Sequence, residues 1–300
     1  MALLIQKEKA LSDKVRKGVV LAAGYGTRFL PATKALPKEM LPIVDKPAIQ
    51  YVAEEAVAAG LTQIILVTAA SKRAVEDHFD RELELERLLE AKGDEGRLRE
   101  VRRLADMADI AFVRQKERLG IGHAVLTARS LVGDEPFALL FPDDVIFGEP
   151  PAIGQLIEIY ERYQGSVVAV ERVPLDEVVN YGIIRPRLLE ERLYEALAIV
   201  EKPSLSEAPS DLGIIGRYVL TPAIFAALAD TPPGAGGEIQ LTDGLSLLLE
   251  RGQRLYAYEI QGERFDVGRP IGLLKASLAE ALRRPDLASE LREYLGQRLT

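Results

Sequence analysis

Residues 18–26 have the sequence Gly-Val-Val-Leu-Ala-Ala-Gly-Tyr-Gly, an apolar run that ends in two closely spaced glycines. Further apolar runs follow at residues 64–68, 110–113 and 137–141. Continuous runs of this kind are typical of strands buried on both faces of a sheet. Helical patterns separate the runs at about residues 48–59, 71–78 (with Ser71 as the N-cap) and 122–130. This β-α-β alternation predicts a doubly wound α/β first half with a largely parallel sheet.

The second half contains more strands. We expect helices near residues 152–163, 222–228 and 240–251, and strands at residues 166–171, 182–185, 194–201, 212–220 and 254–260. The leucine-rich residues 81–104 break at 93–96, which predicts a two-helix insertion whose arginines face solvent. No Pro/Gly/Ser-rich linker divides the halves. We therefore expect one domain over residues 1–300, with an N-terminal extension at about 1–14 and a helical tail at about 270–300.

Composition excludes several classes of function. The net charge of -8 argues against a chain that coats nucleic acid or an anionic membrane. The absence of cysteine excludes disulfides, thiolate metal sites and a cysteine nucleophile. The charged N-terminus has no signal-peptide core, and no apolar stretch reaches the roughly 20 residues of a membrane span. We expect a cytoplasmic protein with neither nucleic-acid nor membrane partners.

The chemistry begins where the first apolar run ends. Gly24 and Gly26 lack a Cβ, so their backbone N–H groups can approach phosphate oxygens closely. The cations Arg28, Lys34 and Lys38 follow, and three prolines restrict the backbone between residues 31 and 42. A dinucleotide-binding GxGxxG motif fails because residue 29 is not glycine, and a P-loop fails because no Gly-Lys pair occurs. The pattern favours a polyphosphate site over a solvated basic loop.

Residues 24–42 form the string GYGTRFLPATKALPKEMLP, which resembles bacterial UTP–glucose-1-phosphate uridylyltransferases within the wider sugar-nucleotide pyrophosphorylases. The resemblance extends over about residues 17–272. Its other landmarks are VRQ at residues 113–115, GIGHA at 120–124, FPDD at 141–144, YGI at 181–183, VEKP at 200–203, GGEIQLTD at 236–243 and FDVG at 265–268. The resemblance implies a Rossmann-like nucleotidyltransferase fold, with a mixed, mostly parallel central sheet flanked by helices.

The resemblance also implies roles for particular residues. The backbone of Ala23, Gly24 and Gly26 and the residues Gln115, Gly120, Gly182 and Glu201 would bind substrates, with Gln115 and Gly120 meeting a pyrimidine edge. Arg28 and Lys38 would hold the departing pyrophosphate, and Lys202 the sugar phosphate. Asp143 and Asp266 would bind Mg²⁺, which needs only one or two carboxylates beside phosphate oxygens and water.

Structural roles are open for several of these residues. Asp143 also fits a helix cap or turn, Asp266 a turn and Gln115 a loop cap, while Glu201 and Lys202 fit a solvated turn. His123 stands at an expected helix start, where a helix-end role is favoured over that of a general base. Asp144 is the weaker candidate for a metal ligand.

The implied reaction is nucleotidyl transfer from UTP to α-D-glucose 1-phosphate, giving UDP-glucose and pyrophosphate. A glucose-1-phosphate thymidylyltransferase is the nearest alternative, because thymine presents the same edge to Gln115. A non-catalytic nucleotide-sugar sensor and a Rossmann oxidoreductase are more distant alternatives. Seven leucines lie between residues 273 and 295, and members of the family commonly associate. Both observations favour a homo-oligomer, either dimer or tetramer.

Overall fold

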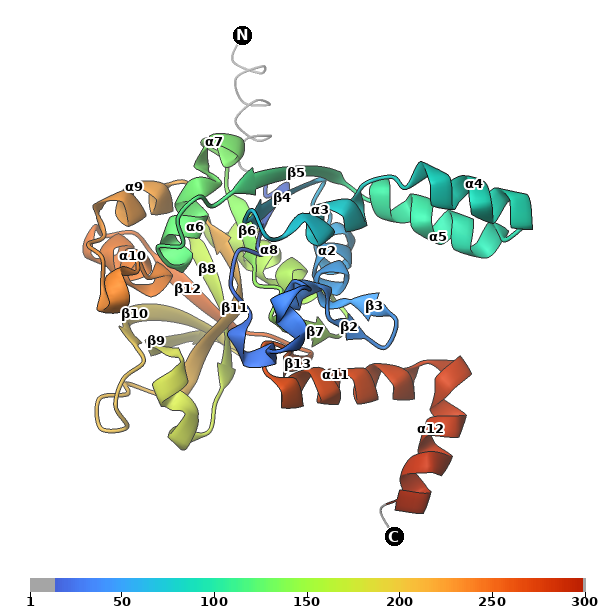
Figure 1. Cartoon of the computed structure of the whole chain (residues 1–300). Helices are drawn as coiled ribbons and strands as arrows, with labels where there is room; N and C mark the ends of the chain where they lie inside the picture. Colours follow the sequence, from blue (N-terminus) through green and yellow to red (C-terminus); the bar gives the residue numbers. More distant parts are fainter. Residues whose placement is uncertain (1–13, 299–300) are drawn as a thin grey trace.

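One mixed sheet collects strands from both halves of the chain in a computed structural model that describes residues 14–298 (Figure 1). The strand order is β5-β4-β1-β6-β11-β8-β12-β10-β9. The strands are β1 (Lys17–Leu21), β4 (Gln63–Thr68), β5 (Asp109–Arg114), β6 (Phe137–Leu140), β8 (Ser166–Arg172), β9 (Gly182–Glu190), β10 (Leu193–Glu201), β11 (Leu212–Leu220) and β12 (Leu255–Glu259). The extension predicted at about residues 1–14 lies almost entirely outside the described residues.

The two halves of the sheet differ in strand direction. β5, β4, β1 and β6 are all parallel, with Val19 of β1 opposite Ile65 on one side and Leu139 on the other. Beyond β6 only β8 and β12 are parallel; β11 runs antiparallel to β6 and β8, and β10 antiparallel to β12 and β9. The predicted mixed α/β sheet is therefore confirmed, and its parallel part is concentrated in the first half.

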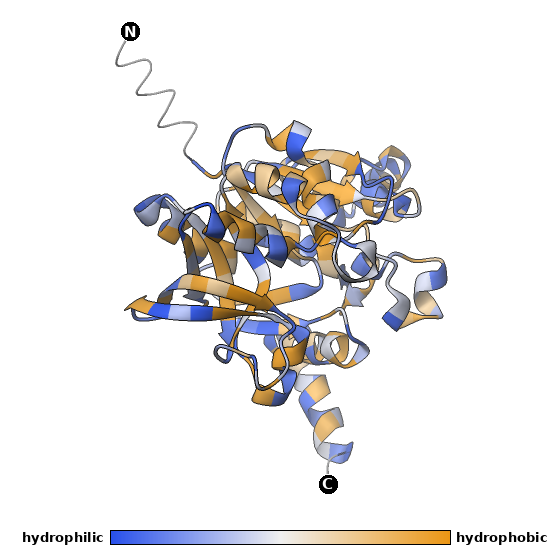
Figure 2. Cartoon of the chain, turned by 90° about the vertical axis from the view of Figure 1, so that its left-hand side faces the viewer, coloured by the Kyte–Doolittle hydropathy of each residue, from blue (hydrophilic) through white to orange (hydrophobic). Residues whose placement is uncertain are grey.

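Helices cover both faces of the sheet because alternate strand residues point to opposite sides. Val19 packs into a core with α6 (Ile121–Thr127), α9 (Ala223–Asp230) and α10 (Leu241–Glu250). Val20 packs into the opposite core with α2 (Ala48–Ala58), α3 (Arg73–Phe79) and α8 (Ala152–Tyr163). Figure 2 shows the apolar strands at the centre of the molecule. Each fully buried aliphatic side chain contributes about 1.5–3 kcal/mol, so these two cores fix the strand edges that bear the site.

The predicted two-helix insertion consists of α4 (Leu83–Lys92) and α5 (Glu95–Ala105), which project from the sheet (Figure 1). The chain reverses at Gly93, whose φ of 66° favours glycine. Arg97 pairs with Asp94 at 2.9 Å and Arg102 with Glu86 at 2.9 Å. These partly exposed ion pairs agree with the predicted solvated faces.

Some boundaries differ from those predicted. Ser71 does not cap α3, because its hydroxyl accepts a bond from Arg118 Nη2 at 3.3 Å and the helix begins after Lys72. The helix predicted over 122–130 is interrupted at Ala128 and resumes as α7 (Arg129–Val132). The C-terminal tail is two helices, α11 (Pro270–Arg283) and α12 (Pro285–Arg298).

Two short antiparallel ribbons and several 3₁₀ turns were not expected from the sequence. The ribbons pair β7 (Asp144–Phe147) with β13 (Glu263–Asp266), and β2 (Pro42–Ile43) with β3 (Lys46–Pro47). The turns are η1 (Thr27–Phe29), η2 (Ala32–Lys34), η3 (Lys38–Met40), η4 (Leu175–Asn180) and η5 (Ala235–Gly237). η1 to η3 place the cationic motif beside the carboxyl end of β1. No helix in the described part of the chain is both long and apolar enough to cross a membrane.

The guanidinium of Arg217 on β11 is fully buried at the junction of the two sheet halves. It pairs with Glu55 of α2 at 2.7 Å. It also donates to the carbonyl oxygens of Phe141, Gly216 and Asp144 at 3.1, 2.8 and 2.8 Å. Arg217 therefore holds both ends of the turn that follows β6.

Replacing this guanidinium should destabilise the fold. Arg217→Met leaves the buried carboxylate of Glu55 uncompensated, so the free energy of unfolding should fall by about 3–5 kcal/mol in urea titrations. Arg172→Met removes an arginine that is half exposed and pairs with Asp211 at 3.0 Å, and it should cost about 0–1 kcal/mol. Equal losses in the two variants would contradict the role assigned to Arg217.

Candidate active site

A cavity of about 430 Å³ opens at the carboxyl edge of β1, β5 and β6. Ligands bind at this edge in open α/β sheets, because loops diverge from the strand ends there. The loop after β1, the turn η3, the segment after β5 and the turn after β6 form its walls. The predicted site residues that line it are Ala23, Gly24, Gly26, Lys38, Gln115, Gly120 and Asp143.

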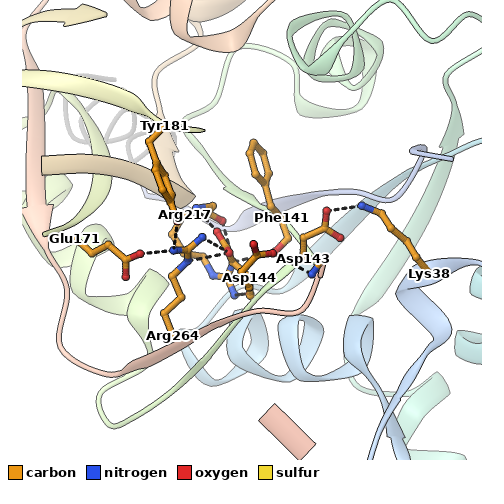
Figure 3. Close-up of polar contacts among 11 residues, drawn as sticks. Lys38, Phe141, Asp143, Asp144, Glu171, Tyr181, Arg217 and Arg264 are labelled. Atoms are coloured by element: carbon orange, nitrogen blue, oxygen red, sulfur yellow. Dashed lines mark hydrogen bonds and ion pairs between the residues drawn. The ribbon is translucent and has the colours of Figure 1, made fainter. Parts of the chain in front are cut away.

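The glycine loop lies directly over the side chain of Lys38. A Cβ on Gly26, where φ is 70°, would stand 3.0 Å from Lys38 Cβ, and a Cβ on Gly24 would stand 3.6 Å from Lys38 Cε. Thr33 fixes the far end of the loop by donating its hydroxyl to the Gly26 carbonyl at 2.7 Å. Gly26 therefore lets the backbone close on the lysine, whereas a Cβ on Gly24 would make only an ordinary contact. The Lys38 ammonium forms an ion pair with Asp143 (Figure 3).

A second, buried ion pair anchors the turn that carries Lys38. Glu39 accepts a bond from Lys72 Nζ at 2.7 Å, and both side chains are almost completely buried. Burial raises the pKa of Glu39, and the charges of Lys72 and Lys38 oppose that effect. Among the described side chains, Glu39 Oε1 is a buried polar atom with no hydrogen-bond partner. The pair joins η3 to the start of α3 and limits the positions open to Lys38.

Gln115 lies at the opposite end of the cavity and is 6% exposed. Its amide nitrogen donates to the Gly120 carbonyl at 3.1 Å and lies 3.1 Å from His123 Nδ1. A Cβ on Gly120, where φ is 95°, would stand 2.7 Å from the Ile239 carbonyl oxygen. Gln115 thus also caps this loop, and His123 has the structural helix-start position favoured from the sequence. The Gln115 carbonyl oxygen has no partner among the described residues and is the group that a base edge can meet.

The metal-binding candidates come together from distant parts of the sequence. Asp143 precedes β7, Asp266 ends β13, and the Val267 amide donates to the Asp143 carbonyl at 2.7 Å. A Cβ on Gly268 would stand 3.1 Å from Asp266 Oδ1 and 3.2 Å from Asp143 Oδ2, so both carboxylates lie close to this glycine and a side chain here would crowd them. Burial, with the neighbouring charges of Asp144 and Asp143, raises the pKa of Asp266.

This donor set fits Mg²⁺. In the described part of the chain no three His, Cys, Asp or Glu side chains converge as a metal-binding group. Two convergent carboxylates are sufficient where phosphate oxygens and water complete the coordination of Mg²⁺. The ammonium of Lys38 beside Asp143 adds a positive charge to the same place.

Asp144, the weaker candidate for a metal ligand, has a structural role. One carboxylate oxygen accepts the Gly216 amide at 2.7 Å, and the other accepts Arg264 Nε at 2.8 Å. Arg264 also pairs with Glu171 and donates to the Tyr181 hydroxyl at 3.4 Å (Figure 3). Arg264 thereby joins the turn after β6 to the residue before β9, which was not expected from the sequence.

The predicted sugar-binding residues gather at the adjoining ends of β9 and β10. Glu201 accepts the Thr242 hydroxyl at 2.8 Å and lies 3.3 Å from Lys202 Nζ. A Cβ on Gly182 would stand 2.8 Å from Thr242 Cγ2 and 3.2 Å from Glu201 Oε2. Lys202 has a φ of 46°, and its amide donates to the Tyr181 carbonyl at 2.9 Å. This sparsely populated backbone conformation commonly marks a functional position.

The structure does not bring every predicted residue to the cavity. Arg28 and Lys34 lie exposed on η1 and η2 and do not line it, so the pyrophosphate role of Arg28 stays a prediction. Arg118 and Tyr25 do line it, although the sequence did not single out Arg118. A single arginine in a loop belongs to no sequence motif, so the sequence does not distinguish it from a surface cation.

Comparisons with known proteins identify the family of this chain. The family model described as nucleotidyl transferase matches residues 17–282. A Bacillus subtilis (strain 168) protein named UTP–glucose-1-phosphate uridylyltransferase is 52% identical over 282 residues, covering 94% of this chain and 96% of its own.

Two solved structures resemble the fold closely. A UDP-glucose pyrophosphorylase complexed with UDP-glucose superposes with a TM-score of 0.82 at 45% identity, covering 90% of this chain and 100% of that one. A UTP-bound UGPase from Acinetobacter baumannii gives a TM-score of 0.87 at 42% identity, covering 94% and 98%. With the family match extending from β1 into α11, the chain belongs to the nucleotidyl transferase family.

Proposed function

We propose that this protein transfers a uridylyl group from UTP to α-D-glucose 1-phosphate, giving UDP-glucose and pyrophosphate. The observation that carries the proposal is the convergence of Lys38, Asp143, Gln115 and the glycine loop on one cavity. The relatives named for this reaction, and the similar structures described with UTP and with UDP-glucose, support the choice of substrates.

The reaction follows from the charges of the reactants. A sugar 1-phosphate is mostly dianionic at neutral pH, because its second pKa is about 6. One of its oxygens attacks the α-phosphorus of UTP, the new P–O bond forms as the bond to the β-phosphate breaks, and pyrophosphate departs with the electron pair. No general base is required. The protein must align the two substrates and neutralise the charge that develops.

The described residues divide this task. Lys38 and the backbone of Ala23, Gly24 and Gly26 would hold the triphosphate, with Arg28 assisting the departing pyrophosphate. Lys202 would orient the sugar phosphate, and Glu201 and Gly182 the sugar. Mg²⁺ held by Asp143 and Asp266 would neutralise phosphate charge. The Gln115 carbonyl oxygen would accept the N3–H that uracil presents.

We further propose that the enzyme acts in the cytoplasm as one domain that associates into a dimer or tetramer. The continuous sheet supports the single domain. α11 and α12 support association, because the apolar side chains of Ile271, Leu274 and Tyr294 are more than half exposed on these helices.

Removal of either metal-binding candidate should nearly abolish turnover. Asp143→Asn and Asp266→Asn should each lose almost all Mg²⁺-dependent activity, while the circular dichroism spectrum stays unchanged. Chelation of the metal with EDTA should abolish the activity of the wild type. Asp134→Asn changes an exposed carboxylate outside the cavity and serves as the matched control. Near-normal Mg²⁺-dependent rates in either site variant would remove that residue from the metal site.

Loss of the Lys38 ammonium should slow the chemical step. Removing one charge-stabilising donor commonly costs about 2.7–4 kcal/mol, so Lys38→Ala should lower kcat at least a hundredfold in a pyrophosphate-release assay. Lys34→Ala, four residues earlier and exposed, is the control. Wild-type kinetics in Lys38→Ala would place this lysine outside the reaction.

A panel of nucleoside triphosphates crossed with sugar 1-phosphates tests the function itself. We expect UTP with glucose 1-phosphate to be used best, dTTP second and purine nucleotides far behind. Gln115→Ala should lower kcat/KM for UTP by about 1–3 kcal/mol, because a base N–H then has no acceptor, whereas the exposed Gln253→Ala should not. Best use of ATP or GTP would overturn the uridylyltransferase assignment.

A further inference from the structure

Arg118 and Tyr25 form a stacked pair at the wall of the active-site cavity. The guanidinium carbon of Arg118 lies 3.7 Å from the centroid of the Tyr25 ring. The Tyr25 side chain is 69% exposed, and it belongs to none of the apolar cores of the described residues. Neither side chain has a role in the transfer described above, and both line the cavity.

Arg118 also binds two other segments. Its Nε donates to the Ala23 carbonyl at 2.7 Å, and Nη2 donates to the Ser71 hydroxyl at 3.3 Å. One side chain from the segment after β5 therefore links the loop after β1 to the turn before α3. A hydrogen bond from a charged donor is stronger than one between neutral groups, and a guanidinium over an aromatic face is attracted to it, so both contacts hold Arg118 in this position.

Arg118 joins two walls of the cavity: the Gln115 wall, residues 115–122, and the glycine wall, residues 23–26. The two walls are held in place by different contacts. The Gln115 wall is packed: Gln115 is buried, and the Gly122 amide and the Leu119 carbonyl both bond to Ile239 at 2.8 Å. The glycine wall has an anchor at each end. Thr33 holds the Gly26 carbonyl on the side of Lys38, and Arg118 holds the Ala23 carbonyl on the side of Gln115.

We propose that the Tyr25–Arg118 pair determines nucleotide specificity by fixing the distance between the glycine loop and the Gln115 wall. In this proposal the anchored Ala23 keeps the space beside Gln115 narrow enough that a one-ring pyrimidine base fits and a two-ring purine would have to displace the loop. Arg118 is a positioning residue in this scheme, since it acts through the loop. The inference rests on the proposed function, because it explains how that site discriminates between bases.

The test compares variants of the two loop anchors. Arg118→Met should lower the ratio of kcat/KM for UTP to kcat/KM for ATP about tenfold or more, mainly through a lower KM for ATP, with kcat for UTP changed far less. Thr33→Val, which releases the other end of the same loop, should lower kcat for every nucleotide and leave the ratio unchanged. Calorimetric competition between UTP and ATP for each variant gives the same comparison without turnover.

Variants of Tyr25 test whether the pair acts as a unit. Tyr25→Phe retains the ring and should keep the wild-type ratio, whereas Tyr25→Ala should lower the ratio less than Arg118→Met does, because Arg118 keeps its bonds to Ala23 and Ser71 in that variant. The double variant Tyr25→Ala with Arg118→Met should lose no more discrimination than Arg118→Met alone, because that single variant already removes the stacking contact. Arg114→Met is the control, because Arg114 is an exposed arginine at the end of β5, four residues before Arg118.

Each contrary outcome has its own meaning. An equal fall for all nucleotides in Arg118→Met would show direct phosphate binding and overturn the proposal. A lower melting temperature with an unchanged ratio would show a structural role only and would also overturn it. If the wild type prefers a nucleotide other than UTP, the proposed function fails. The pair is then tested by the ratio of kcat/KM for that nucleotide to kcat/KM for a nucleotide whose base has the other number of rings.

Discussion

The ion pair between Arg217 and Glu55 is the contact on which the site geometry depends. Arg217 holds the carbonyl oxygens on both sides of Asp143, so the turn that bears this carboxylate cannot shift without breaking bonds to a buried cation. A buried guanidinium is tolerated only where every donor is satisfied and its charge is compensated. Glu55 supplies the compensation and accepts the Ile153 amide at 2.9 Å, which also fixes the start of α8.

Further ion pairs fix other parts of the site relative to this turn. Arg264 joins Asp144 to Glu171 and Tyr181, and so fixes the residues proposed for the sugar relative to those proposed for the metal. Lys72 and Glu39 hold the lysine-bearing turn on the opposite side. The groups proposed to contact substrates are thus held in place by Arg217, Arg264 and Lys72, for which no contact with substrate is proposed. The apolar cores hold the strands that bear the site.

The predictable parts of the molecule are those with a local signal. The parallel strands were evident from continuous apolar runs, and residues at their carboxyl ends had to meet, which brings Lys38 to Asp143. β7 and β13 lack such a signal: each has four residues and includes charged ones, and they become strands only by pairing with each other. The roles of Arg118, Arg217 and Arg264 were not predicted, because nothing local in the sequence distinguishes an arginine that joins distant segments from one on the surface.

The carboxylates proposed for the metal and the residues proposed for the sugar stand on different sheets. Asp143 and Asp266 are aligned by the β7–β13 ribbon, whereas Gly182 and Glu201 belong to the edge of the large sheet. Substitutions along that edge can reshape the sugar pocket while the ribbon register, and with it the separation of the two carboxylates, stays as it is. Changes in acceptor choice can therefore arise along that edge without rebuilding the ribbon, provided that they leave the contacts of Arg264 with Glu171 and Tyr181 in place.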